Sequence, residues 1–360
     1  MAIRSASLLL LPLLLSASMS ISIPVAGDEA TLLAFKAAAI SGGHDNLLPS
    51  WNASSVSGFC SWEGVKCGGA RLRRVMALSL PSYGFTGTLS PAIGNLTFLQ
   101  VLNLSSNGFQ GTVPASIGRL VRLKTLDLSD NTFSGALPAN LSSCVSLLFL
   151  SLRSNQLHGS IPTELGRKLT NLQNLSLADN RLTGDIPASL ANMSSLYFLR
   201  LSSNQLEGPI PPELGSIGGL RFLYLFENNL SGVLPNSLYN LSMLQRFSVV
   251  NNSLSGTIPK NIGDRFPNIE DLAFAVNQFH GTIPPSLSNL SALTMLEFAW
   301  NSFSGRIPRS LGRLKGLVYI NLYLNELEAN DREGWEFITD LANCSQLQKL
   351  EYNQCSANSR

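Results

Sequence analysis

A repeat of 24 residues constrains the fold of this chain more than any other feature of its sequence. Asparagine recurs ten times at intervals of 24 residues, or of 25 in two places, and apolar residues stand eight, five and three positions before each copy. Such a period indicates a solenoid, in which each coil buries its apolar side chains against the neighbouring coils. The ten asparagines are Asn107, Asn131, Asn155, Asn180, Asn204, Asn228, Asn252, Asn277, Asn301 and Asn325.

The apolar residues before each asparagine predict a short strand. Two apolar positions separated by one residue alternate with a period of two, so both point into the core while their neighbours face outward. The chain must turn soon afterwards, and a buried asparagine can donate and accept hydrogen bonds at that corner. We therefore expect the ten asparagines to form a structural ladder. Tyr83 stands 24 residues before Asn107 and opens an eleventh, degenerate copy.

A second motif, Gly-x-aliphatic-Pro, follows the asparagine in nine copies, for example from Gly135 to Pro138. Glycine permits a positive φ at a bend, and proline suits the first turn of a helix. Each coil is therefore predicted to hold a strand, a bent extended segment and a helical turn on the opposite side. A single narrow core repeated in this way explains why 65 of the 360 residues are leucine.

The amino terminus has the layout of a secretory signal peptide. Residues 1–26 carry Arg4, an apolar block from Leu8 to Leu15 and then small residues, and we expect cleavage between Ser18 and Gly27. This block is too short to cross a membrane, which needs roughly 20 apolar residues. No other run is long enough, so the sequence predicts a secreted, extracellular chain without a membrane span.

Export permits disulfides, and the five cysteines have different surroundings. Cys60 and Cys67 are close in sequence and near two tryptophans, so we expect them to be bonded. Cys144 and Cys344 occupy matching places in the repeat, where a free buried thiol is the expected state. Cys355 is left as an odd thiol near the end of the chain.

The repeat unit, Leu-x-x-Leu-x-Leu-x-x-Asn-x-Leu-x-Gly-x-Ile-Pro, resembles the plant extracellular leucine-rich repeat. Residues 28–67, with Leu32, Leu33, Phe35 and Lys36 and the Trp-x-Gly-Val-x-Cys motif that ends at Cys67, resemble the amino-terminal cap of receptor-like kinases and receptor-like proteins. The segment 328–347 is similar to the subfamily that includes immune receptors for microbial peptides.

This resemblance implies an α/β solenoid, a right-handed superhelix with a parallel β-sheet on its concave face and a helical amino-terminal cap. The expected domains are a signal peptide (1–26), the cap (27–70), about 11 repeats (71–327) and a degenerate, incomplete last repeat without a carboxy-terminal cap (328–360). The family binds peptide or protein ligands on the concave face and often meets a receptor-kinase co-receptor along one edge.

Four positions in each coil are predicted to face outward on the concave sheet, namely six, four, two and one before the asparagine. The position four before it holds Arg200, Tyr224, Ser248 and Glu297 in different coils. Large aromatic and charged side chains gather in two adjacent coils, and a second group follows further on. The candidates in the first group are Phe198, Arg200, Phe222, Tyr224, Phe226 and Glu227, and those in the second are Trp300, Tyr319 and Tyr323. Exposed aromatics favour a binding site, although rings that shield one another would need no ligand.

Eleven Asn-x-Ser/Thr sequons suit an exported glycoprotein. Three of them, at Asn103, Asn174 and Asn251, fall on concave positions, where a glycan would obstruct a partner. We therefore expect the first coils to be masked and binding to concentrate around residues 198–227. The sequons are at Asn52, Asn95, Asn103, Asn140, Asn174, Asn192, Asn229, Asn240, Asn251, Asn289 and Asn343.

Composition and motifs disfavour two other classes of function. With 25 basic and 23 acidic residues the formal charge is only +2, so the chain lacks the basic excess of a nucleic-acid-binding protein. No nucleotide-binding, kinase or hydrolase motif occurs, and His158 and His280 stand five coils apart, with His44 in the cap. We therefore expect no catalytic residue, no metal and no cofactor.

The repeat breaks after Asn325, where a charged stretch replaces the Gly-x-Ile-Pro motif. Leu347, Leu350 and Tyr352 reopen a strand, but Cys355 stands where the next asparagine belongs. The family usually continues with a second cysteine pair, a transmembrane helix and often a kinase. The sequence thus predicts the ligand-recognition module of a plant receptor in defence or developmental signalling, as a truncated product or fragment, or else a short secreted form. The alternatives are a secreted inhibitor of a microbial cell-wall-degrading enzyme and an inactive truncated product.

Overall fold

The computed structural model describes residues 27–40, 47–52, 58–68, 73–329 and 331–352. The expected signal peptide, His44 and Cys355 lie outside these residues. Within the described ranges, no helix is both long enough and apolar enough to cross a membrane.

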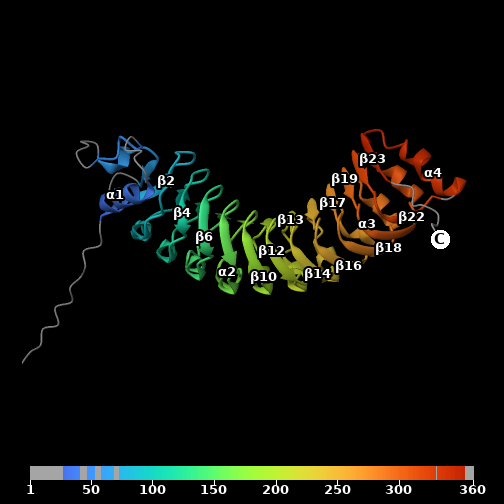
Figure 1. Cartoon of the computed structure of the whole chain (residues 1–360), viewed down its shortest axis with the longest axis horizontal. Helices are drawn as coiled ribbons and strands as arrows, with labels where there is room; N and C mark the ends of the chain where they lie inside the picture. Colours follow the sequence, from blue (N-terminus) through green and yellow to red (C-terminus); the bar gives the residue numbers. More distant parts are fainter. Residues whose placement is uncertain (1–26, 41–46, 53–57, 69–72, 330, 353–360) are drawn as a thin grey trace, which may run out of the picture.

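The predicted solenoid is confirmed. Figure 1 shows the coils stacked along an arc, with helix α1 at one end, helix α4 at the other and the larger sheet along the inner side. In this sheet of 13 strands, β1 pairs antiparallel with β2 and every later strand is parallel to its neighbour. Its strands are β1 Val65–Cys67, β2 Val75–Ser79, β3 Val101–Asn103, β5 Thr125–Asp127, β7 Phe149–Ser151, β9 Asn174–Ser176, β11 Phe198–Arg200, β13 Phe222–Tyr224, β15 Arg246–Ser248, β17 Asp271–Ala273, β19 Met295–Glu297, β21 Tyr319–Asn321 and β23 Lys349–Glu351.

A second parallel sheet of ten strands covers one flank of the described solenoid. The sequence predicted an extended segment here but not its pairing with the next coil. The glycine of each Gly-x-aliphatic-Pro motif has a positive φ, for example 81° at Gly135, as expected at a bend. The strands are β4 Gln110–Thr112, β6 Thr132–Ala136, β8 Gln156–Gly159, β10 Arg181–Asp185, β12 Gln205–Gly208, β14 Asn229–Val233, β16 Ser253–Thr257, β18 Gln278–Thr282, β20 Ser302–Arg306 and β22 Glu326–Glu328.

Short helices lie on the outer side of the coils, and most begin directly after the motif proline, as at Pro138, whereas the helix after Pro259 begins at Ile262. The 3₁₀ helices are η1 Phe59–Ser61, η2 Pro91–Asn95, η3 Ala115–Arg119, η4 Ala139–Ser143, η5 Ala188–Asn192, η6 Pro212–Ser216, η7 Asn236–Asn240, η8 Pro285–Asn289 and η9 Arg309–Arg313. The α-helices are α1 Asp28–Ala39, α2 Thr163–Lys168, α3 Ile262–Arg265 and α4 Arg332–Leu341.

The asparagine ladder is confirmed. In the coil of Asn131, the side-chain Nδ2 donates to the carbonyl oxygens of Leu104, Leu128 and Ser129 at 3.0–3.1 Å, and Oδ1 accepts from the N–H of Phe109 at 3.0 Å. The other nine asparagines make the same set of bonds in the turns of their own coils. Each amide therefore links two successive coils, which is a structural role.

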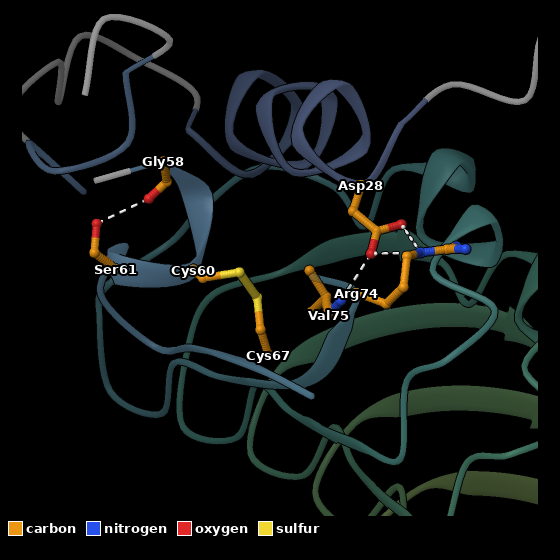
Figure 2. Close-up of a disulfide and its surroundings, with 7 residues drawn as sticks. All are labelled: Asp28, Gly58, Cys60, Ser61, Cys67, Arg74 and Val75. Atoms are coloured by element: carbon orange, nitrogen blue, oxygen red, sulfur yellow. Dashed lines mark hydrogen bonds and ion pairs between the residues drawn. A yellow bond between two sulfur atoms is a disulfide. The ribbon is translucent and has the colours of Figure 1, made fainter. Parts of the chain in front are cut away.

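The amino-terminal cap closes the first coil. Asp28, at the start of α1, is buried and accepts from Arg74 Nε at 3.0 Å and from the Val75 N–H at 2.7 Å. Figure 2 shows this contact together with the disulfide between Cys60 and Cys67, which confirms the expected pairing.

The last coil keeps its strand, because β23 pairs with β21 in the register of the other coils. The charged stretch that replaces the motif forms α4, with Asp331 as its N-cap accepting from Gly334 N–H at 2.7 Å. Acidic side chains of this segment bind Arg306 and Arg309 of the preceding coil. Cys144 and Cys344 are free and buried, as expected.

Candidate ligand-binding face

The structure brings the first candidate group together on two adjacent strands. Phe198 and Phe222 are register partners on β11 and β13, with ring centroids 5.8 Å apart. The ring of Tyr224 lies 5.8 Å from that of Phe198 and 6.3 Å from that of Phe226. We call Phe198, Arg200, Phe222, Tyr224 and Phe226 the aromatic patch.

The side chains of the aromatic patch shield one another only in part, since all five remain half-buried. The guanidinium of Arg200 lies 5.9 Å from the ring centroid of Tyr224 and 5.7 Å from that of Phe226, and its Nε donates to Ser202 Oγ at 3.1 Å. The patch thus combines accessible ring surface with a cation. Both features are common in binding sites.

Glu227 borders the patch at its rim. It is exposed and has a φ of 55°, because the residue before each ladder asparagine adopts the left-handed conformation. Its carboxylate accepts a hydrogen bond from Ser203 Oγ at 2.6 Å. This carboxylate therefore belongs to the same surface, although the backbone turn separates it from the strand.

The second candidate group forms a hollow at the carboxy-terminal coils. Trp300 and Tyr323 are 57% and 43% exposed and line a hollow of about 530 Å³. Its remaining lining residues are Asn321, Leu350, Glu351 and Tyr352. We call this the carboxy-terminal hollow.

Tyr319, the third candidate of this group, is not among the residues that line the hollow. Its hydroxyl donates to Glu351 Oε2 at 3.0 Å and accepts from Asn321 Nδ2 at 3.0 Å, so it is held in a hydrogen-bonded network. Its ring is covered in part by the ammonium group of Lys349, 5.2 Å from the centroid. Tyr319 supports the hollow through Glu351 and Asn321.

Most concave charges are paired. Arg153 contacts both Asp130 and Asp179 at 3.4 Å, and Arg246 contacts Asp271 at 3.1 Å. The nearby carboxylate of Asp271 raises the pKa of Arg246 further. The pair of Arg246 and Asp271 is neutral, and Arg153 with its two aspartates leaves one net negative charge.

Glu297 is different. Burial, and then repulsion from Glu351, raise the pKa of its carboxyl group. Glu351 itself has a lowered pKa, because Lys349 and Tyr319 donate hydrogen bonds to its carboxylate. The two carboxylates flank Asn321, which is the register partner of both.

Sequence reasoning left Asn321, Glu351 and Tyr352 out of the site. The repeat spacing could have found the first two, since they stand four residues before Asn325 and Cys355. Tyr352 stands three residues before Cys355, a position that the repeat assigns to the core, so the spacing did not indicate a surface role.

The remaining predictions about sites concern glycans and metals. Asn103 and Asn174 lie on strands β3 and β9, and Asn251 directly precedes a ladder asparagine, so all three are on the concave side as predicted. His158 and His280 are exposed on strands β8 and β18. No three His, Cys, Asp or Glu side chains among the described residues are grouped so that they could hold a metal ion.

Comparison with known proteins identifies the repeat. The family model "Leucine rich repeat N-terminal domain" matches residues 25–68, and models of the leucine-rich repeat match residues 97–157, 171–193, 195–217 and 219–241. The chain therefore carries leucine-rich repeats behind their amino-terminal domain. Its match begins in the cap and continues through the coils that carry the aromatic patch.

The relatives of this leucine-rich-repeat chain include plant receptor kinases. "Receptor kinase-like protein Xa21" from Oryza sativa subsp. japonica is 46% identical over 79 residues, which is 21% of this chain and 8% of that protein. The receptor-like kinase EFR from Arabidopsis thaliana is 45% identical over 74 residues, 21% of this chain and 7% of that protein. The matched segments thus span less than a tenth of the length of these relatives.

Solved plant receptor ectodomains have the same fold over most of this chain. The crystal structure of PEPR1–AtPEP1 gives a TM-score of 0.78 at 37% identity and covers 91% of this chain and 45% of that one. The Arabidopsis receptor kinase HAESA, solved with the peptide hormone IDA and the co-receptor SERK1, gives 0.51 at 25% identity and covers 83% and 66%.

Proposed function

We propose that this chain is the ligand-recognition module of a plant cell-surface receptor and binds a peptide or protein ligand on its concave face without catalysing a reaction. The observation that carries the proposal is the aromatic patch. Its rings and the Arg200 cation remain accessible on a rigid sheet, as the anchors of a binding site do. The solved neighbours support it, since HAESA was crystallised with a peptide hormone.

The proposal includes a second receptor. HAESA was solved together with the co-receptor SERK1. We propose that one edge of this solenoid meets such a partner while the concave face holds the ligand. A role in defence or developmental signalling belongs to the same proposal, in view of the resemblance of segment 328–347 to the receptor subfamily that includes immune receptors.

Binding to an array of short synthetic peptides tests the proposal. We expect Phe222→Ala and Trp300→Ala to weaken binding of any peptide selected by the parent chain, because each removes an accessible aromatic ring. Val233→Ala is the control, since Val233 is an apolar residue about as exposed as Trp300 but lies on the second sheet. If both concave variants bound selected peptides as tightly as the parent, the concave face would not be the binding site.

A further inference from the structure

One row of residues crosses the concave sheet with opposite charges at its two ends. Arg200, Tyr224, Ser248, Ala273 and Glu297 are successive register partners on strands β11, β13, β15, β17 and β19. A ligand lying along the solenoid axis would meet them in this order. We call these five residues the polar row.

The Arg200 end of the polar row offers an uncompensated cation. Among the described residues its guanidinium contacts two aromatic rings and Ser202, but no carboxylate pairs with it. The rings hold the group in place without neutralising it, and a guanidinium presents several N–H donors in one plane. An anionic group such as a carboxylate is the natural partner for this end.

The Glu297 end offers an uncompensated anion. In the part of the chain that the structure describes, its half-buried carboxylate makes no hydrogen bond or ion pair. Repulsion from Glu351 adds to the cost of leaving it ionised. The exposed rings of Trp300 and Tyr323 stand beside this row in the carboxy-terminal hollow. Aromatic faces beside a carboxylate suit a guanidinium or an ammonium group.

The middle of the polar row consists of small, uncharged side chains. Ser248 is half-buried and Ala273 is buried, and the positions two residues beyond Ala273 and Glu297 hold the buried side chains of Ala275 and Ala299. These small side chains lie between the aromatic patch and the carboxy-terminal hollow, both of which are built from large side chains. They leave room for a backbone with small side chains.

We propose that the polar row binds an extended peptide segment that places an acidic group against Arg200 and a basic group against Glu297. This inference rests on the proposed function of the concave face and adds the chemistry of the ligand. Four strand intervals of about 4.8 Å separate the two ends by about 19 Å. An extended peptide rises about 3.3 Å per residue, so the two charged residues should be about six positions apart.

Synthetic peptides of alanine and serine with one Asp and one Arg test this spacing by titration calorimetry on the secreted chain. Ser253→Ala is included throughout to delete the sequon at Asn251, so that a glycan at the rim of the row does not interfere. We expect the peptide with a spacing of about six to bind at least roughly fivefold more tightly than a peptide with adjacent charges, or one with Asn and Gln in their place.

Variants at the two ends give the decisive result. We expect Arg200→Gln and Glu297→Gln each to remove the preference, and Glu297→Arg to transfer it to a peptide with two Asp residues at the same spacing. Glu213→Gln, an exposed carboxylate on the outer helix η6, is the control and should keep the preference. Thermal melting of each variant shows whether it is folded.

Two results would overturn the inference: equal affinity for all spacings and charges, including no measurable binding of any of these peptides, or an unchanged preference in Glu297→Arg. Neither result bears on the proposed function, because Phe222→Ala and Trp300→Ala would still weaken binding of other peptides if the concave face binds ligands. If those two variants bound peptides as tightly as the parent chain, the proposed function itself would be contradicted.

Discussion

Two carboxylates on the concave sheet show how strongly the surroundings of a residue determine its chemistry. Glu351 has hydrogen-bond donors from Lys349 and Tyr319, and its pKa is lowered. Glu297 has no such donor among the described residues, and burial together with Glu351 raises its pKa. A glutamate carboxylate therefore has hydrogen-bond partners in one coil and none in another. A carboxylate without partners on a binding face is a candidate contact for a ligand.

Replacing Glu297 by glutamine should stabilise the folded chain at neutral pH. A carboxyl group with a raised folded-state pKa contributes stability that is fully present below its unfolded-state pKa and lost as pH rises through the folded-state pKa. We therefore expect Glu297→Gln to melt at a higher temperature than the parent at pH 7 and at the same temperature near pH 3. A melting temperature lowered by the substitution at pH 7 would show that the carboxylate has a stabilising partner.

Substitution of a ladder asparagine, unlike that of Glu297, should strongly destabilise the folded chain. Asn228 Nδ2 donates to three carbonyl oxygens at 3.1–3.2 Å, and its Oδ1 accepts from Leu206 N–H at 3.0 Å. Asn228→Ala leaves these buried groups without partners, so we expect a loss of about 3 kcal/mol in the free energy of unfolding, measured by urea denaturation. Asn236→Ala, at an exposed asparagine on η7, should cost little, and equal losses would refute the ladder role.

At the scale of the coil, small residues on the outer side allow the helical turns to stack. A Cβ added at Gly215 on η6 would lie against the backbone carbonyl of Ser237 in the next coil. Gly218, three residues later, has no atom within 4 Å of such a Cβ. At Gly215 the next coil thus lies too close to leave room for a side chain.

These two glycines make a matched pair. We expect Gly215→Ala to lower the free energy of unfolding by about 1–3 kcal/mol through overpacking against rigid backbone. Gly218→Ala should be neutral or stabilise the chain, because it restricts the unfolded state without a clash. Thermal melting of both variants checks this, and a destabilisation confined to Gly218→Ala would contradict the packing argument.

The periodic features of the fold could be predicted, because a fixed repeat converts sequence spacing directly into strand register. Phe198 and Phe222 are 24 residues apart and are register partners for that reason. The pairing in the second sheet was missed, because the Gly-x-aliphatic-Pro motif indicates a bend and an extended segment but not a hydrogen-bonded partner for that segment. Glu351 was missed as a site residue although it stands four residues before Cys355, and Tyr352 was missed because the position three before the asparagine is a core position in the other coils.

At the scale of the whole molecule, a solenoid has no contacts between coils that are not neighbours. A destabilising substitution at one end should therefore affect only the nearby coils. Every coil packs only on its two neighbours, and the first coil depends on the cap. The cap is joined to it by Asp28, by the Gly87 and Thr88 N–H groups that donate to the end of α1, and by Phe35, whose ring contacts Phe85. The stability of this end therefore depends on few residues.

Asp28→Ala tests this locality. The buried carboxylate pairs with Arg74 and accepts from the Val75 N–H, so its loss leaves both donors unsatisfied, and we expect local stability to fall by about 3 kcal/mol. Hydrogen exchange should accelerate in α1 and β2 while the coils beyond Asn131 keep the protection of the parent chain. Glu29→Ala, one residue further along the same helix, should leave exchange unchanged. Faster exchange spread evenly over all coils would mean that the chain unfolds as one cooperative unit. Coils that make no contact with Asp28 can be affected by its loss only if all coils unfold together.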